Sequence, residues 1–448
     1  MTYRAVALLA LCLAASADPA RAQNQGLRAK ISQLFIFGPG EDPLFLGGTA
    51  DPNNPQNVRV HGTHFVPAAV SENASLIGFI TDAISNSVGN VPTGSTSGGV
   101  TFRFEGGAPV KTSTSAGPIF AERAQTLGRG RGLVGVGRNV FHFSTLRGVP
   151  LNNIELFFTH QNVDFEGCDE TAGGDCTLMG IPNLENDIMQ FKLDLDLNVQ
   201  VTSLYATYGV FDWLDLGVVV PLISTKLHGE STAQIIPFGG TSAAHFFAGT
   251  TTDPELSATR LVDGSSFGLG DVSARMKISV HQSARSSFAL LGDARFATGS
   301  AEDLLGSGQF AARGMAIVSG AIGPVSPHAN LGYAYRAGAD QNDAVLATAG
   351  FDQLVAEHVT LAADIVSELQ VGRSNLTIPP TVQYDYPFRR TVVPTSIPDI
   401  RDDIVSGSFG FKFTTTNGFT IVTNALIPLN RGGLRSDVIY TAGVELNF

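Results

Sequence analysis

The last thirteen residues of the chain, 436–448, alternate between apolar and polar side chains with one interruption. The even-numbered positions carry the apolar residues, which are Val438, Tyr440, Ala442, Val444, Leu446 and Phe448. Polar residues and a glycine occupy the odd positions, where Ile439 is the single misfit. Successive side chains of a β-strand point to opposite faces. The segment therefore predicts a strand with one apolar and one polar face, which ends on an aromatic residue of the apolar face.

The same alternation recurs in short segments from about residue 99 onward. Charged residues form only 15% of the chain, against roughly 25% in soluble proteins. Mean hydropathy is +0.14, yet the chain after its leader has no apolar run near the roughly 18 residues of a spanning helix. Frequent but dispersed apolar residues are typical of transmembrane barrels. We predict an all-β membrane protein, an antiparallel transmembrane β-barrel of about 14 strands with an N-terminal plug-like segment.

The predicted strands are counted by their turns. They lie near residues 100–104, 133–143, 153–163, 191–208, 214–220, 272–280, 288–296, 310–319, 329–335, 344–354, 359–365, 409–413, 419–427 and 437–448. A change of phase in 191–208 predicts a bulge near Ser203. Connections at 211–212, 282–286, 323–325 and 415–418 are short, whereas 225–265, 372–402 and the cysteine loop are long. Short periplasmic turns opposite long external loops are the expected asymmetry of bacterial barrels.

The N-terminal quarter of the chain divides into two predicted parts. Residues 1–22 read as a cleavable signal peptide, with Arg4, a short apolar run and Ala20-Arg21-Ala22 before the cleavage point. Residues 23–98 form a plug or periplasmic segment, and 99–448 form the barrel. Within 75–86 an amphipathic helix is predicted from the helical spacing of Leu76, Phe79, Ile80 and Ile84. Three locations fit this helix: a plug inside the barrel, which we favour, a periplasmic cap, or the membrane interface.

Two cysteines remain after cleavage, Cys168 and Cys176, in a polar, acidic loop. In an oxidising compartment an even, closely spaced pair predicts a disulfide, with two free thiols as the alternative. The acidic residues miss the calcium-loop spacing, so we predict no metal and no cofactor. Gly-x-Gly-x-x-Gly at 130–135 leads into a strand rather than a helix, and other catalytic motifs are absent, so we predict no enzyme. A net charge of −12 argues against a nucleic-acid partner.

The polar strand faces are predicted to line the lumen, because the apolar faces must contact lipid. The charged candidates are Arg103, Glu105, Lys192, Asp194, Asp196, Asp271, Arg275, Lys277, Asp293, Arg295, Asp364, Glu368, Lys412, Asp437 and Glu445. Both signs occur, so these charges are expected to pair with one another and with the plug. Pro221 cannot donate to a ladder and marks either a kink in the wall or the end of its strand.

The terminal Phe448, with Tyr440, Val444 and Leu446 on the same face, resembles the C-terminal assembly signal of bacterial outer-membrane barrels. Residues 208–221, 268–272 and 297–308 resemble the long-chain fatty acid transporter superfamily, especially its relatives encoded with phenol and aromatic-hydrocarbon degradation pathways. The resemblance implies an outer-membrane channel for passive diffusion of hydrophobic small molecules through a plugged barrel. Its implied partners are outer-membrane lipids, the barrel-assembly machinery and a hydrophobic solute. A general diffusion porin and a structural or adhesive barrel acting through its long loops are the alternatives.

Overall fold

The computed structural model describes residues 26–37, 83, 102–105, 108–111, 115–159, 188–237, 246–250, 252–283, 285–338, 341–376, 378, 381–384 and 389–448. The signal peptide, Cys168, Cys176, Leu76, Phe79, Ile80 and Ile84 lie outside these described residues. The predicted cleavage, disulfide and amphipathic helix therefore stay predictions. Within the described ranges, no helix has both the length and the apolar character needed to cross a membrane.

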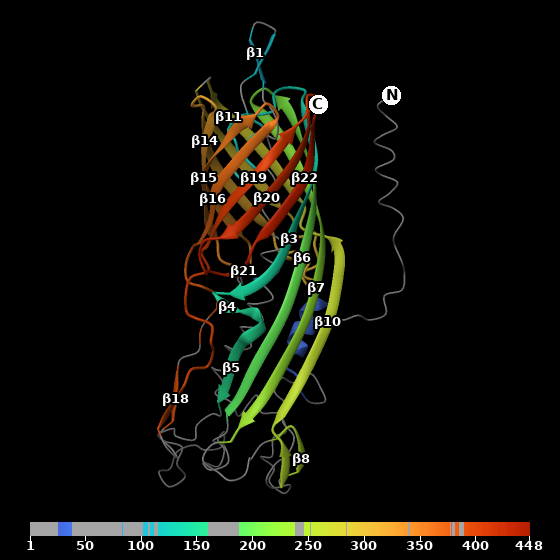
Figure 1. Ribbon diagram of the computed structural model, residues 1–448, viewed down its shortest axis with the longest axis vertical. Coiled ribbons are helices and arrows are strands. Elements are labelled where there is room, and N and C mark those ends of the chain that lie inside the picture. Colours follow the sequence, from blue (N-terminus) through green and yellow to red (C-terminus); the bar gives the residue numbers. More distant parts are fainter. Residues whose placement is uncertain are drawn as a thin grey trace, which may run out of the picture.

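Twelve antiparallel strands close into a barrel (Figure 1). In ring order they are β3 (Gly132–Leu146), β6 (Ile188–Phe211), β7 (Leu214–Ile236), β11 (Ser273–Gln282), β12 (Ser286–Arg295), β13 (Ala311–Gly320), β14 (Val325–Arg336), β15 (Ala344–Ala356), β16 (Val359–Gln370), β19 (Ile404–Thr414), β20 (Phe419–Pro428) and β22 (Ile439–Asn447). The terminal strand β22 pairs with β3 and so closes the ring. An antiparallel barrel is predicted correctly, but its strand count is smaller than expected.

Two predicted strands do not belong to the ring. The segment near 100–104 contains β1 (Phe102–Glu105), which pairs with β2 (Ala108–Lys111) in a two-stranded hairpin separate from the ring. The segment near 153–163 contains β5 (Ile154–Thr159), which pairs with the far part of β6. Both alternate like barrel strands, and alternation alone does not tell which sheet a strand joins. Because two strands leave the count, its even parity is unchanged.

The turns sort by length between the two ends of the barrel. Short turns join β6 to β7, β11 to β12, β13 to β14, β15 to β16 and β19 to β20. These five turns lie at the end where the chain terminates, which we call the C-terminal rim; the β1–β2 hairpin also projects there (Figure 1). The opposite end, the long-loop rim, carries β4 (Val149–Pro150), η2 (Leu151–Asn153), β8 (Ala248–Thr250), β9 (Asp253–Glu255), β17 (Val382–Tyr384), β18 (Arg390–Val392) and β21 (Leu434–Ser436).

Beyond the long-loop rim, β6 and β7 continue as an open sheet flanked by β5 and β10 (Ser257–Leu269), which we call the extension (Figure 1). Its inner face packs on α2 (Leu27–Gln33), where Ile31 is fully buried and Phe35 stacks on Phe191 at 5.5 Å between ring centroids. Residues 225–236 and 257–265, parts of a stretch expected to be a loop, lie in β7 and β10 of this ladder. Residues 26–37 of the predicted plug thus pack on the extension.

The alternation of β6 reverses its polarity at the base of the extension. Odd-numbered residues face inward from Met189 to Gly209. From Phe191 to Val201 they are apolar and buried, whereas the intervening residues 192–200 are polar. From Ser203 onward the inward residues are mainly polar, and the outward ones, at 204–208, are apolar. Pairing with β7 runs without a shift from Ile188 to Gly209, so the bulge predicted near Ser203 is wrong; the shift lies between Gly209 and Phe211. The strand passes from an aqueous extension into a membrane.

The outward faces of the barrel strands form a belt of exposed apolar side chains. Large examples are Val136, Leu216, Met276, Leu290, Val318, Leu331, Ile365, Phe409, Ile421 and Val444. Polar and charged residues are buried instead, which inverts the arrangement of a soluble protein. A closed barrel satisfies every wall hydrogen bond between strands, which is what lipid demands. The architecture is that of a transmembrane β-barrel of the bacterial outer-membrane type.

Candidate functional site

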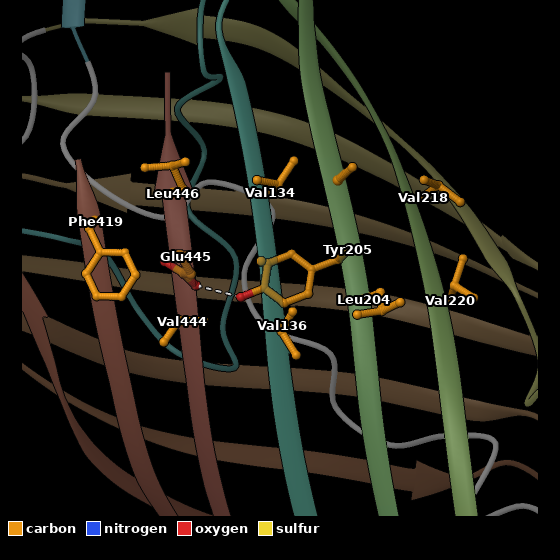
Figure 2. Close-up of a pocket in the computed structure, with 12 residues that line it drawn as sticks. Val134, Val136, Leu204, Tyr205, Val218, Val220, Phe419, Val444, Glu445 and Leu446 are labelled. Carbon is orange, nitrogen blue, oxygen red and sulfur yellow. Dashed lines mark hydrogen bonds between the residues drawn. The ribbon is translucent and has the colours of Figure 1, made fainter. Parts of the chain in front are cut away.

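Residues 115–131, which we call the luminal segment, lead from the β1–β2 hairpin to β3 through the interior of the barrel. In Figure 2 a teal coil runs behind β3 and β22, between the near wall and the far strands. The segment forms neither helix nor strand. Its side chains at Ile119, Glu122, Arg123 and Leu127 are nonetheless buried. Irregular chain thus fills space that alternating strands leave open.

Wall side chains provide partners for the backbone of this segment, which has no ladder of its own. The pairs are Ala116 N–H to Thr360 Oγ1 (2.9 Å), Glu122 N–H to Asn330 Oδ1 (3.0 Å), Ala124 N–H to Ser319 Oγ (2.9 Å), Leu127 N–H to Asp215 Oδ2 (3.0 Å), and Asn330 Nδ2 to Glu122 O (2.9 Å). Buried backbone groups need such partners. Because the acceptors and donors come from β7, β13, β14 and β16, the segment is fixed to several sides of the ring.

One buried cluster holds the middle of the luminal segment to β14, β15 and β16. Arg123 contacts the Asp352 carboxylate at 2.5 Å, and the Ser115 hydroxyl donates to the same carboxylate. His328 Nε2 lies 2.6 Å from Asp364 Oδ1, and His328 Nδ1 lies 3.4 Å from Asp352 Oδ1. Two basic groups therefore face two carboxylates. Breaking such a buried pair from one side costs about 3–5 kcal/mol, since it leaves a charge without a partner.

A second cluster involves Glu122, which meets Arg275 and Lys277 of β11 at 3.8 Å each. Lys277 Nζ also donates to the Arg123 carbonyl at 3.3 Å. Arg275 Nε in turn donates to Asp293 Oδ2 at 2.7 Å. These side chains are buried. The luminal segment thus supplies one carboxylate and one guanidinium to complementary charges on the wall.

The third cluster lies on the wall drawn in Figure 2. Tyr205 of β6 donates through its hydroxyl to Glu445 Oε1 at 3.1 Å, and Lys412 Nζ lies 3.5 Å from Glu445 Oε2. The tyrosine ring covers Gly135, where an added Cβ would stand 2.4 Å from the ring. Glycine is required at this position because a side chain would displace the tyrosine from its carboxylate.

Two hollows border the luminal segment among the described residues. Between Ile119, Phe120 and the inward residues Tyr205 and Lys412, the void measures about 30 Å³, room for about two water molecules. A larger bowl of about 790 Å³ opens at the C-terminal rim, between the two ends of the segment and the turns at 357–358 and 415–418. Its floor includes Ala116 and Leu127. The bowl leads to the luminal segment from one side.

Eight of the charged lumen candidates face the barrel interior. Arg275, Lys277, Asp293, Asp364, Lys412 and Glu445 are buried there, and Arg295 and Glu368 are half-buried on the same inward faces. Glu368 pairs with Arg336. Asp271 is buried at the junction of β10 and β11.

Six other candidates do not lie on inward faces of the ring strands. Lys192, Asp194 and Asp196 are exposed on the outer face of the extension, because alternation reverses polarity there. Asp437 is exposed and accepts a hydrogen bond from Ser144 at 2.6 Å, since it precedes β22. Arg103 and Glu105 belong to β1, which forms no part of the barrel wall. The misfit Ile439 packs against the apolar core of the extension.

Pro221 and Asp271 together build the point where β7 changes partner. β7 pairs with β11 up to Val219 and with β10 from Leu222, and the Pro221 carbonyl accepts from the Gly270 N–H at 2.8 Å. Proline has no N–H to extend this edge. The Asp271 carboxylate accepts from Gly299 N–H (3.0 Å) and from Ser307 N–H and Oγ (both 2.8 Å). The three stretches that carry the family resemblance are therefore joined in space.

Sequence reasoning missed the luminal segment, Arg123 included, and its wall partners Asp352, His328 and Asn330. One signal was available, because residues 112–131 lack alternation yet precede a strand that begins at the rim with short turns. A long connection at that rim has no extracellular loop to form. Burial inside the barrel is the remaining place for it.

One ion pair on the outer face of the extension gives a pH-dependent prediction. His228 Nδ1 lies 2.6 Å from Asp263 Oδ1, and this hydrogen bond and the carboxylate charge raise the pKa of His228 above 6.5. Protonated His228 therefore stabilises the extension fully below pH 6.5, and this contribution is lost as pH rises through the raised pKa. Histidine ring signals in NMR should titrate with a midpoint above 6.5 that falls in Asp263→Asn. A midpoint at or below 6.5 in the unmodified chain would contradict the pair.

No protein-family model matches the sequence, and no curated protein matches it either. Among solved structures, the chain is similar to an outer membrane channel from Pseudomonas putida F1, at 11% identity and a TM-score of 0.40, over 72% of this chain and 98% of that one. It is also similar to the TodX monoaromatic hydrocarbon channel (10%, TM-score 0.33, 73% and 91%) and to a FadL homologue from Pseudomonas aeruginosa (8%, TM-score 0.30, 71% and 88%). At these identities no residue-by-residue correspondence follows.

Proposed function

We propose that the protein is a bacterial outer-membrane channel for passive uptake of small hydrophobic molecules, and that the luminal segment restricts passage. One observation carries the proposal: residues 115–131 fill the interior but are held mainly by side-chain hydrogen bonds and ion pairs. A segment held in this way can be displaced without unfolding a wall strand. TodX, to which the barrel is similar, is a monoaromatic hydrocarbon channel, and that class of solute agrees with this proposal.

The proposed route begins at the extension. Short turns mark the periplasmic rim of bacterial barrels, which directs the extension outward. Its inner face is apolar around Phe191, Leu193 and Leu195 and is covered by α2 and Phe35. An apolar solute that displaces this cover would be stabilised there because its surface leaves water. The charged interior below offers no such gain. Collection of solute and control of its passage are thus separated along the barrel.

A general diffusion porin is the weaker alternative. A porin keeps a water-filled lumen, whereas the void between the luminal segment and the wall at Tyr205 and Lys412 is about 30 Å³. An adhesive barrel would not need to control passage through its interior. That function therefore does not account for the three charged clusters.

A reversible lock tests the proposal. Ala124→Cys and Ser319→Cys would join the luminal segment to β13 where the Ala124 N–H already meets Ser319 Oγ at 2.9 Å, in a background with Cys168→Ser and Cys176→Ser. Uptake of a radiolabelled aromatic hydrocarbon and of a long-chain fatty acid would be measured in a deletion strain that expresses each variant. The oxidised lock should abolish uptake, and a reductant should restore it. Failure of the unlocked chain to increase uptake of either solute would refute the channel itself.

A further inference from the structure

We propose that a groove on the outer wall binds a membrane lipid with a phosphate headgroup, whose phosphate contacts Arg138 and whose acyl chain lies over β22, β20 and β19. The groove has a volume of about 380 Å³. This inference goes beyond the proposed function, because it concerns the lipid-facing surface and not the interior.

The groove arises where small outward residues lie between large ones. Ala425 and Ala442 form its floor with Thr423, and Ala425 lies between Tyr440 and Phe409 of the neighbouring strands. The flanking side chains are Val140, Phe409, Phe411 and Tyr440. An extended hydrocarbon chain fits such a hollow, because it gains contacts that a flat wall would not give. Hydrocarbon alone would select no particular lipid.

Arg138 gives the groove its preference for a lipid with a phosphate headgroup. It is exposed on the outward face of β3 between Val136 and Val140, and it lies opposite Ala442 in the ladder with β22. A charged residue on the lipid face costs about 2–4 kcal/mol at mid-membrane and close to nothing at the interface. Two outward positions further, His142 Nδ1 lies 2.6 Å from Asn198 Oδ1, on the polar face of the extension. Arg138 thus stands at the boundary where lipid headgroups lie.

The guanidinium of Arg138 is not neutralised by a carboxylate in the part of the chain that the structure describes. It donates to the neutral Gln200 Oε1, whereas Arg123, Lys277 and Lys412 in the interior each meet a carboxylate. A guanidinium has five N–H donors in a planar fork. Phosphate matches that fork in charge and in geometry. A phosphate on a lipid would at the same time place its chain at the mouth of the groove.

The same wall carries a natural control. A second groove of about 440 Å³ adjoins the first and is lined outward by Val134, Val136, Leu204, Ala206, Val218, Val220, Phe419, Val444 and Leu446 (Figure 2). Its two polar residues, Tyr205 and Glu445, bond to each other within the barrel. This groove is apolar throughout and has no cation at its edge. It should accept hydrocarbon without preference for a headgroup.

Native mass spectrometry of the full chain in detergent tests the proposal with phosphatidic acid, phosphatidylcholine of the same chains, and inorganic phosphate as probes. Phosphatidic acid should bind more tightly than phosphatidylcholine, and Arg138→Gln should weaken it roughly ten-fold, the size of one lost charged hydrogen bond. Ala442→Phe, which fills the groove, should weaken it similarly, whereas Ala206→Phe in the second groove and Arg285→Gln in a turn should not. Arg138→Lys should retain part of the preference.

Three results would overturn the proposal. The first is equal affinity of the unmodified chain for phosphatidic acid and phosphatidylcholine, which needs no variant to fold. The second is unchanged binding in Arg138→Gln, with folding confirmed by heat-modifiable migration. The third is inorganic phosphate that competes as well as the lipid and is indifferent to Ala442→Phe, which would reduce the site to a free-anion contact.

Discussion

Deleting residues 23–128 while keeping the signal peptide should turn a barrel that does not conduct ions in planar bilayers into one that does. The deletion removes the luminal segment from Ser115 to Gly128 while keeping Gly130, whose N–H donates to the Gly209 carbonyl, and the start of β3. The charged wall residues Arg275, Lys277 and Asp352 would then face water instead of Glu122 and Arg123. A twelve-stranded ring lies between filled eight-stranded barrels and porins of 16–18 strands. An emptied, charged interior should therefore hydrate.

A shorter deletion of residues 23–111 is the matched control. It removes α2, the β1–β2 hairpin and the whole predicted plug at 23–98, but it leaves the luminal segment in place. We expect this variant to conduct no more ions than the full chain. Ion conductance by the shorter deletion would show that residues 23–98 restrict passage. Absence of conductance in both deletion variants would show that another part of the chain closes the barrel.

A point variant should produce a smaller version of the same effect. Arg123→Ala leaves Asp352 buried with only His328 and the Ser115 hydroxyl as partners. The uncompensated charge costs up to about 3–5 kcal/mol, and release of the luminal segment is the least disruptive way to hydrate it. We expect intermittent openings rather than a permanently open pore. Arg129→Ala, at an exposed position in the same segment, should show none.

The strands were predictable because alternation is a local property. Period-two patterning located all twelve ring strands along the chain and the short turns between them. What it could not decide was partner choice, because β5 alternates as well as β12 does yet pairs with the extension of β6 instead of joining the ring. Lipid and lumen were also assigned by polarity alone, a rule that holds only within the membrane. At Phe191 the apolar face looks inward onto Phe35, so Lys192 and Asp194 were placed on the wrong side.

Only the wall side of the interior site could be predicted, again because alternation is a local property. Inward charges such as Lys277 and Glu445 follow from the same alternation, but their partners do not, since Lys277 meets Glu122 from an irregular segment. No periodicity marks a chain that takes its hydrogen bonds from many strands. Asn330, Ser319 and Thr360 look like ordinary lumen residues until the backbone they satisfy is located. Such pairings are properties of the closed ring.

The second large effect is expected at the C-terminus, where Phe448→Asp should sharply reduce the amount of assembled barrel in the membrane. Phe448 lies at the seam between the first and last ring strands, and exchanges both backbone hydrogen bonds with Gly132, at 2.9 and 3.0 Å. Its ring covers Gly132, where an added Cβ would lie 2.4 Å from the ring. Tyr440, Val444 and Leu446 are exposed on the same lipid-facing side. The residue thus completes both the ladder and the apolar row of the closing strand.

The folded barrel itself should tolerate the change, which separates assembly from stability. The Phe448 side chain is 69% exposed and stands at the rim, where a charge on the lipid face costs about 0–1 kcal/mol, and aspartate keeps both backbone hydrogen bonds. Barrel that does assemble should therefore unfold at nearly the same temperature as the unmodified chain. Phe267→Asp is the matched control, because Phe267 is 74% exposed but lies on β10 in the extension. Heat-modifiable barrel should fall strongly in Phe448→Asp and stay normal in Phe267→Asp. Equal levels in both would show that Phe448 is only another exposed aromatic residue, whereas a matching loss of thermal stability would place its effect in the folded seam.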